Sequence, residues 1–251
     1  MASATTPSQT ATGSDNSFAR IFGAIFSPKP TFASIARRPS WILPLILIAI
    51  VATAMFFVYG QRVGWRANIL RQIEQSDRAQ KQMEQLTPEK REAVIDQQAK
   101  VGMYVIYSLG SVGVFIFAFI VAGLLMLGFM ILGVRPTFFQ SLGIVSHAWL
   151  PGIIAALLGI LVLYIKDPAT VDLQNLVSAN LGAVMPDTSP KWLTVLLSTF
   201  DIFTFWKIAL MALGFSAVDP KRLSFGKAFG FIFALYFFWM LIVTGFTAAF
   251  A

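Results

Sequence analysis

The sequence predicts an all-α integral membrane protein, a bundle of five transmembrane helices with short interfacial and extramembrane amphipathic helices. Two observations lead to this prediction. Hydrophobic residues make up 57% of the 251 residues and charged residues only 12%, whereas soluble globular domains carry about 25% charged residues. The apolar residues are also gathered into five long runs separated by polar segments.

Composition excludes several kinds of chemistry. The chain has no cysteine and one histidine, so disulfides, thiolate nucleophiles and cysteine- or histidine-rich metal clusters are not expected. No Gly-rich phosphate loop or nucleophile elbow is present either. We therefore expect no cofactor, no metal and no enzymatic activity.

Each apolar run reaches the roughly 20 residues that a helix needs to cross a bilayer. The second run is longer than one upright span requires, and Tyr104 and Tyr107 near its start indicate that the span proper is closer to residues 110–133. The five predicted spans are residues 41–59, 103–134, 139–165, 192–215 and 228–250.

The distribution of basic residues predicts which side each loop faces. Nearly all of the net charge of +7 falls before the first span and in the second and fourth loops. The positive-inside rule therefore places the N-terminus in the cytoplasm and the C-terminus outside. The first loop does not fit this assignment, because it would lie outside although it carries eight basic and six acidic residues. Because the positive charge serves orientation, it does not indicate a nucleic-acid partner.

Three of the segments outside the predicted spans have a distinctive composition or pattern. Residues 1–17 are rich in Ser, Thr and Ala and are expected to be a disordered tail. Residues 18–40 predict two short amphipathic helices in the cytoplasmic interface, which either brace the bundle or bind lipid or a partner. Residues 61–100 predict charged external helices, restarted at Thr87 by a cap followed by proline. They form either a solvated cover or a docking surface.

Four polar residues inside or near the spans are candidates for an intramembrane site: Asp201, His147, Lys207 and Gln140. Charges in hydrocarbon persist when they are paired, reach the interface or serve a function. Asp201 and Lys207 are six positions apart, about 240° around a helix, so a direct pair along one helix is not expected. Estimated depths allow either of them to contact His147 across the third and fourth spans. Asp201 acts either as a structural determinant of packing or in transport.

Small residues on the third span indicate close helix packing. Gly152 with Ala156, and Ala155 with Gly159, are spaced by four residues, which permits close approach of another helix. Pro151 predicts a kink or hinge.

Three stretches, taken in order, resemble bacterial Yip-domain proteins. They are FSPKPTF at 26–32 with RPSW at 38–41, FFQS at 138–141 with HAWLP at 147–151, and LSTFDIFTFW at 197–206, where the aspartate is followed by Trp206 and the span is closed by Gly214. The resemblance implies a helical membrane domain with a cytoplasmic N-terminus. Eukaryotic relatives associate with Rab/Ypt-type small GTPases in vesicle traffic, and the long charged first loop puts such a partner in doubt here.

Two functions follow from these observations. The first is a non-enzymatic scaffold or adaptor in the bacterial inner membrane, whose partners are the lipid bilayer and other membrane proteins or a second copy of itself. The second is a transporter or permease subunit with an ion or proton site at Asp201.

Overall fold

The computed structural model describes residues 17–250 except 75, 172, 174–175, 178 and 187–188. The predicted tail lies almost wholly outside the described residues. The described part is helical, and its α-helices are α1 (Ser17–Phe26), α2 (Pro28–Arg37), α3 (Ile42–Arg62), α4 (Trp65–Glu74), α5 (Asp77–Glu84), α6 (Pro88–Ser108), α7 (Val114–Ile131), α8 (Phe138–Ala148), α9 (Pro151–Ile165), α10 (Lys191–Ser198), α11 (Ile202–Val218) and α12 (Phe225–Phe250). Three short helical turns complete it: η1 (Leu109–Gly113), η2 (Pro168–Thr170) and η3 (Leu181–Val184).

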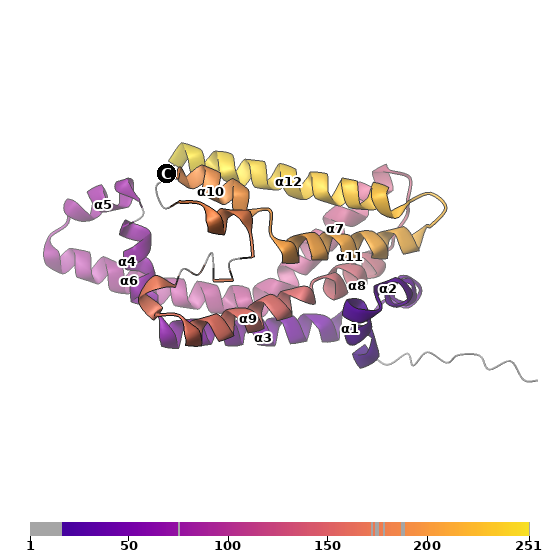
Figure 1. Ribbon diagram of the computed structural model, residues 1–251, viewed down its shortest axis with the longest axis horizontal. Coiled ribbons are helices and arrows are strands. Elements are labelled where there is room, and N and C mark those ends of the chain that lie inside the picture. The colour runs from indigo at the N-terminus through magenta and orange to yellow at the C-terminus, as the bar shows by residue number, and fades with distance from the viewer. Residues whose placement is uncertain are drawn as a thin grey trace, which may run out of the picture.

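The chain passes back and forth along the long axis of the bundle (Figure 1), through α3, through α6 with α7, through α8 with α9, through α10 with α11, and through α12. Four helical stretches are long and apolar enough to cross a membrane, namely Ile42–Arg62, Pro88–Ile131, Phe138–Ile165 and Phe225–Ala248. The remaining pass is made by α10 and α11, of which α11 is a shorter apolar helix. The all-α membrane fold predicted from the sequence is confirmed, and the protein is a multi-pass membrane protein.

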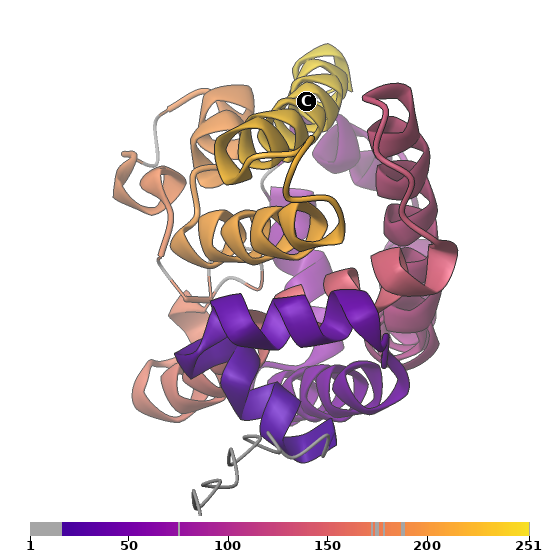
Figure 2. The same ribbon diagram turned by 90° about the vertical axis from the view of Figure 1, so that its right-hand side faces the viewer.

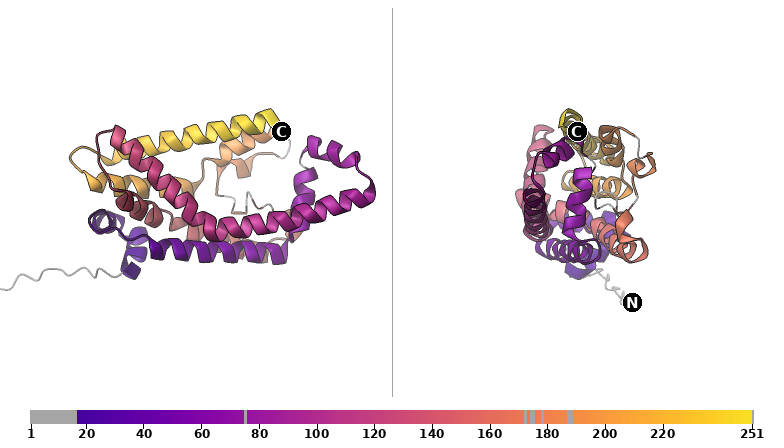
Figure 3. Two further views of the ribbon diagram at one scale, coloured as in Figure 1. Left: turned by 180° about the vertical axis from the view of Figure 1, so that it is seen from behind. Right: turned by 90° about the vertical axis from the view of Figure 1, so that its left-hand side faces the viewer.

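The second pass is one unbroken helical path of 44 residues from Pro88 to Ile131 (Figure 3). Thr87 caps it through its hydroxyl, which accepts from the Lys90 amide, and Pro88 occupies the first turn, as the sequence predicts. A π-turn at η1 interrupts the regular hydrogen bonding, and the Ser111 hydroxyl donates to the Tyr107 carbonyl beside it, 2.7 Å away. The α6 part of this helix lies largely beyond the other spans (Figure 1).

Glycine is required where α7 turns into the next segment. Gly133 has φ +80°, a conformation that side-chain-bearing residues avoid. The Val134 amide donates to the Phe129 carbonyl and the Gly133 amide to the Met130 carbonyl, both at 3.0 Å, which closes the helix as a Schellman motif.

The third and fourth passes are each broken. α8 stops at Ala148, and Pro151 starts α9 after a tight turn. The fourth pass differs from the single helix expected over residues 192–215, because α10 ends at Ser198 and α11 begins at Ile202.

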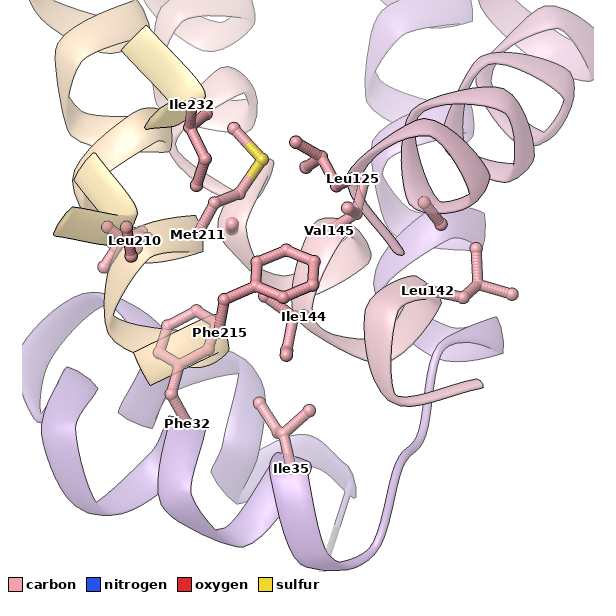
Figure 4. Close-up of a cluster of buried hydrophobic side chains, with 14 of the residues drawn as sticks. Phe32, Ile35, Leu125, Leu142, Ile144, Val145, Leu210, Met211, Phe215 and Ile232 are labelled. Carbon is pink, nitrogen blue, oxygen red and sulfur yellow. The ribbon is translucent and has the colours of Figure 1, made fainter. Parts of the chain in front are cut away.

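The main hydrophobic core lies at the end of the bundle that carries α1 and α2. Phe32 and Ile35 of α2 are fully buried against Ile144 of α8 and Phe215 of α11 (Figure 4). Phe129 of α7 stacks on Phe215 with ring centroids 4.4 Å apart. The helix α2 thus belongs to the core and crosses the end of the bundle (Figure 2). Of the two expected roles of this segment, α2 takes the bracing one.

Two prolines lie in the first turn of α2 and do not delay its start, which is at Pro28. Both Pro28 and Pro30 lie in its first turn, where a backbone N–H has no partner within the helix.

Candidate functional site at the broken fourth span

Asp201 lies in the break and not within a helix. Its backbone is extended, with φ −103° and ψ 136°, and its carboxylate Oδ1 accepts a hydrogen bond from the Thr204 amide at 2.8 Å. This is the geometry of a helix N-cap, in which the side chain satisfies an amide that has no partner in the helix. The negative charge also lies at the positive end of the α11 dipole.

A connecting loop reaches the same break. Asn180 and Asp201 form an isolated antiparallel bridge, and the Ile202 amide donates to the Ala179 carbonyl at 3.2 Å. Gly182 in η3 lies so close to the Ser198 side chain and the Thr194 carbonyl of α10 that a Cβ at this position would collide with both. The loop between α9 and α10 therefore supplies backbone partners to the broken span.

The last helix completes the site. The Tyr236 hydroxyl of α12 donates to the Thr199 carbonyl at 3.1 Å and also interacts with the Thr204 side chain. Backbone groups in a bilayer need partners within the protein. At the break, backbone groups therefore receive hydrogen-bond partners from α12, from the loop and from the Asp201 side chain.

Lys207 lies on α11 one and a half turns beyond the cap. Asp201 is the charge that acts on its ammonium group, but no ion pair in the described part of the chain joins the two. Because a helical Cβ points toward the helix N-terminus, the long Lys207 side chain is directed toward the Asp201 level.

His147 does not contact Asp201 or Lys207 through any hydrogen bond found in the described part of the chain. It is fully buried on α8, and its Nδ1 lies 2.8 Å from the Gly143 carbonyl, so Nδ1–H is the donor and Nε2 is left as an acceptor. A Cβ at Gly143 would contact Ile35 and Pro39, which places this face of α8 against α2 and the following linker. The nearby charge is Arg20 of α1.

Gln140 has a structural role at the start of α8. Its side-chain oxygen accepts from the Thr137 amide at 2.8 Å while the Thr137 hydroxyl accepts from the Gln140 amide, which is a capping box. Its side-chain nitrogen donates to the Ala36 carbonyl at 2.7 Å. Gln140 therefore ties α8 to α2 and lies apart from Asp201.

Some of the predicted helix-packing positions are closely packed against neighbouring side chains, and others have open space beside them. Gly214 faces Ile144 and the ring of Phe32 so closely that a Cβ would collide with Ile144, and Trp206 packs against the same core. On α9, a Cβ at Gly159 would lie 2.8 Å from Leu176. Nothing lies within 4 Å of a Cβ at Gly152, one turn before Ala156, so no close approach is made there.

Two arginines hold the charged helices outside the bundle in place. The sequence did not indicate their contacts. Arg66 of α4 forms ion pairs with Glu92 and Asp96 of α6. The hydrogen bond to Glu92 is the largest influence that raises the pKa of Arg66 above its ordinary value. Arg71 donates to the carbonyls of Val171 and Pro168, which joins α4 to the loop after α9. Spacing alone does not distinguish these arginines from the other basic residues of the loop.

The described residues contain no group of three or more His, Asp or Glu side chains that could hold a metal ion. The polar groups at the break serve as caps and hydrogen-bond partners of the backbone, and this arrangement fixes the bend of the fourth pass. Tyr236 and Thr199 were not predicted as site residues, because each lies inside a predicted apolar span and is uncharged.

Comparison with known families agrees with this architecture. The Yip1 domain matches residues 22–248, which is most of the chain. No similar curated protein and no similar solved structure was found. The chain belongs to the Yip1 domain family.

Proposed function

We propose that this protein is a non-enzymatic scaffold or adaptor of a bacterial cell membrane, and that the charged helices α4, α5 and the first part of α6 form its docking arm. The observation behind the proposal is the continuity of α6 with the second span. A partner bound to the arm is connected to the membrane domain by one helix and not by a flexible linker.

The arm is held in one position by contacts along its length. The ion pairs of Arg66 fasten α4 to α6, and the hydrogen bonds of Arg71 fasten α4 to the loop after α9. A rigid surface loses little conformational entropy when a partner binds. The arm presents mixed charge and amide groups through its exposed residues, which include Lys81, Gln82, Glu84, Glu89, Lys90, Asp96 and Gln97.

The proposed orientation puts the arm on the external side. The opposite end of the bundle carries the basic residues before the first span and in the turns α7–α8 and α11–α12, which the positive-inside rule assigns to the cytoplasm. The partner of the arm is then an external or membrane protein, or a second copy of this chain. A cytoplasmic small GTPase would not reach it.

Photocrosslinking in native membranes tests the proposal. A photoreactive amino acid at Gln82, Glu89 or Gln97 should give discrete protein adducts. The matched control is Phe238 on α12, which is 63% exposed on a span and should react with lipid. Absence of protein adducts from all three arm positions, in a chain that accumulates normally, would contradict the docking role. An adduct of twice the chain mass would identify self-association.

A second function is favoured by one observation, the helix break with Asp201 and Lys207 at membrane depth. Broken helices of this kind hold ions or substrates in many transporters. Against transport, the Asp201 carboxylate is already used as a cap.

Reconstituted vesicles distinguish the two functions, because Asn caps a helix about as well as Asp but carries no charge. A scaffold should give no ion or proton flux above that of empty vesicles for the wild type or for Asp201→Asn. Flux in the wild type that is lost in a folded Asp201→Asn variant would establish the transporter and refute the scaffold.

A further inference from the structure

The first helix presents aromatic side chains away from the bundle. Phe22 and Phe26 of α1 are 64% and 81% exposed, and Phe18 on the same stripe is 58% exposed. Positions four apart lie on one face of a helix. The opposite face, with Ile21 and Ala24, is buried in the core. The helix therefore buries one apolar face in the core and leaves a second, aromatic face exposed.

The direction of this face is fixed by Arg20. Its guanidinium donates to the Arg38 carbonyl at 2.7 Å, to the Ser40 hydroxyl at 3.2 Å and to the Ser34 hydroxyl at 3.0 Å. These acceptors lie on α2 and on the linker that enters the first span. The outward face of α1 is thus held in a set direction relative to the start of α3.

The same linker keeps α1 and α2 close to the start of the first long apolar helix. Only residues 38–41 separate the end of α2 from Ile42, the first residue of α3. Ile42, Ile46 and Ile50 of α3 are 55%, 40% and 60% exposed, as expected for a side of the span that faces lipid. Both α1 and α2 lie at the end of the bundle where this span begins (Figure 2).

The charges at this end favour anionic headgroups. The only acidic residue among the described residues before the first span and in the turns α7–α8 and α11–α12 is Asp219. Together with Arg20, six basic residues occupy those segments, and a seventh, Lys227, lies in the first turn of α12: Lys29, Arg37, Arg38, Arg135, Lys221 and Arg222 are the six. Clustered basic residues beside a span attract anionic lipid.

We propose that α1 is a fixed bilayer anchor. Phe22 and Phe26 insert at the boundary between headgroups and acyl chains, and the surrounding basic residues bind anionic headgroups of the same leaflet. This surface is independent of the arm at the other end of the bundle, so its failure would leave the docking proposal intact.

The chain has no cysteine, so a single introduced cysteine can be labelled without first removing native cysteines. The variants Phe22→Cys and Phe26→Cys carry an environment-sensitive fluorophore in nanodiscs of phosphatidylcholine and phosphatidylglycerol. Ile46→Cys is the control for lipid exposure and Glu89→Cys the control for water. Lipids with a nitroxide high on the acyl chain should quench the labels at 22 and 26 at least twofold more than the label at 89. Aqueous iodide should show the reverse order.

Water, or a protein that covers the outward face of α1, would give different quenching results from lipid. Labels at 22 and 26 that respond to iodide and not to nitroxide lipid would overturn the proposal. Shielding from both quenchers would also overturn it, because a protein or a second copy would then cover the face. Replacing all anionic lipid by phosphatidylcholine should reduce nitroxide quenching at least twofold, as should the double variant Lys29→Gln/Arg37→Gln. No reduction in either case would refute the role of the basic residues.

Discussion

The Tyr236 hydroxyl of α12 donates a hydrogen bond to the Thr199 carbonyl, 3.1 Å away, at the point where the fourth pass is broken. A carbonyl at a helix end lacks its partner within the helix. In hydrocarbon no water replaces that partner, so a neighbouring helix must supply it. The phenol of Tyr236 therefore joins the last two passes at the position where one of them loses regular structure.

Removing this hydroxyl should destabilise the fold. We expect Tyr236→Phe to lower the free energy of unfolding by about 1 kcal/mol, the usual net value of one hydrogen bond. Thermal or denaturant unfolding in detergent measures the loss. Tyr104→Phe is the matched control, because Tyr104 is 58% exposed, and it should have no effect. Equal effects of the two substitutions would contradict the role of Tyr236.

The cap at Asp201 gives a prediction about substitution type. Asp201→Ala leaves the Thr204 amide without its acceptor and should cost about 0.5–2 kcal/mol. Asp201→Asn keeps an acceptor oxygen and should stay close to wild type. Unfolding of both variants under the same conditions provides the comparison. A larger loss for Asn than for Ala would show that charge, and not capping, is the main contribution of Asp201.

Gly214 provides a test of core packing. A Cβ there would collide with Ile144 and lie 2.9 Å from the ring of Phe32, and both side chains are fully buried. Gly214→Ala should therefore destabilise the protein by about 1–3 kcal/mol through overpacking. Gly230→Ala on α12, where nothing lies within 4 Å, should be neutral or stabilising because alanine favours helix by about 1 kcal/mol. If the unfolding midpoint of Gly214→Ala were equal to or above that of the wild type, the tight contact at Gly214 would be refuted.

The proposed orientation is testable by cysteine labelling. A membrane-impermeant maleimide should label Glu89→Cys in cells whose inner membrane is intact. It should label Lys29→Cys only after that membrane is permeabilised. Both side chains are exposed, so the difference reports sidedness and not burial. The opposite pattern would reverse the assignment of the two ends.

The sequence predicted the helical passes well because each has a length requirement that apolar composition reveals directly. Pro151 was predicted as a kink for an equally local reason, since proline lacks the N–H that would continue α8. The start of α6 at Thr87 and Pro88 was also predicted by local capping chemistry.

The break at Asp201 could not be predicted in the same way. The residues from 192 to 215 are apolar enough for one helix, and what interrupts them is tertiary. The Ile202 amide bonds to Ala179, 23 positions earlier, and the Thr199 carbonyl bonds to Tyr236, 37 positions later. Depth estimates on a straight helix brought His147 near the two charges, but they did not specify its direction around α8. Contacts with α2 set that direction.

The continuity of Pro88–Ile131 has a mechanical consequence. Its outer end carries the arm, and its inner end carries Phe129, which is stacked on Phe215 beside α2. A rotation or tilt imposed on the arm therefore moves a lever whose far end lies in the best-packed part of the molecule. The π-turn at Leu109–Gly113 is the place along that lever where the regular hydrogen bonding changes and bending is easiest. In the proposed orientation, a displacement of the arm would reach the cytoplasmic end of the bundle through the backbone of this one helix.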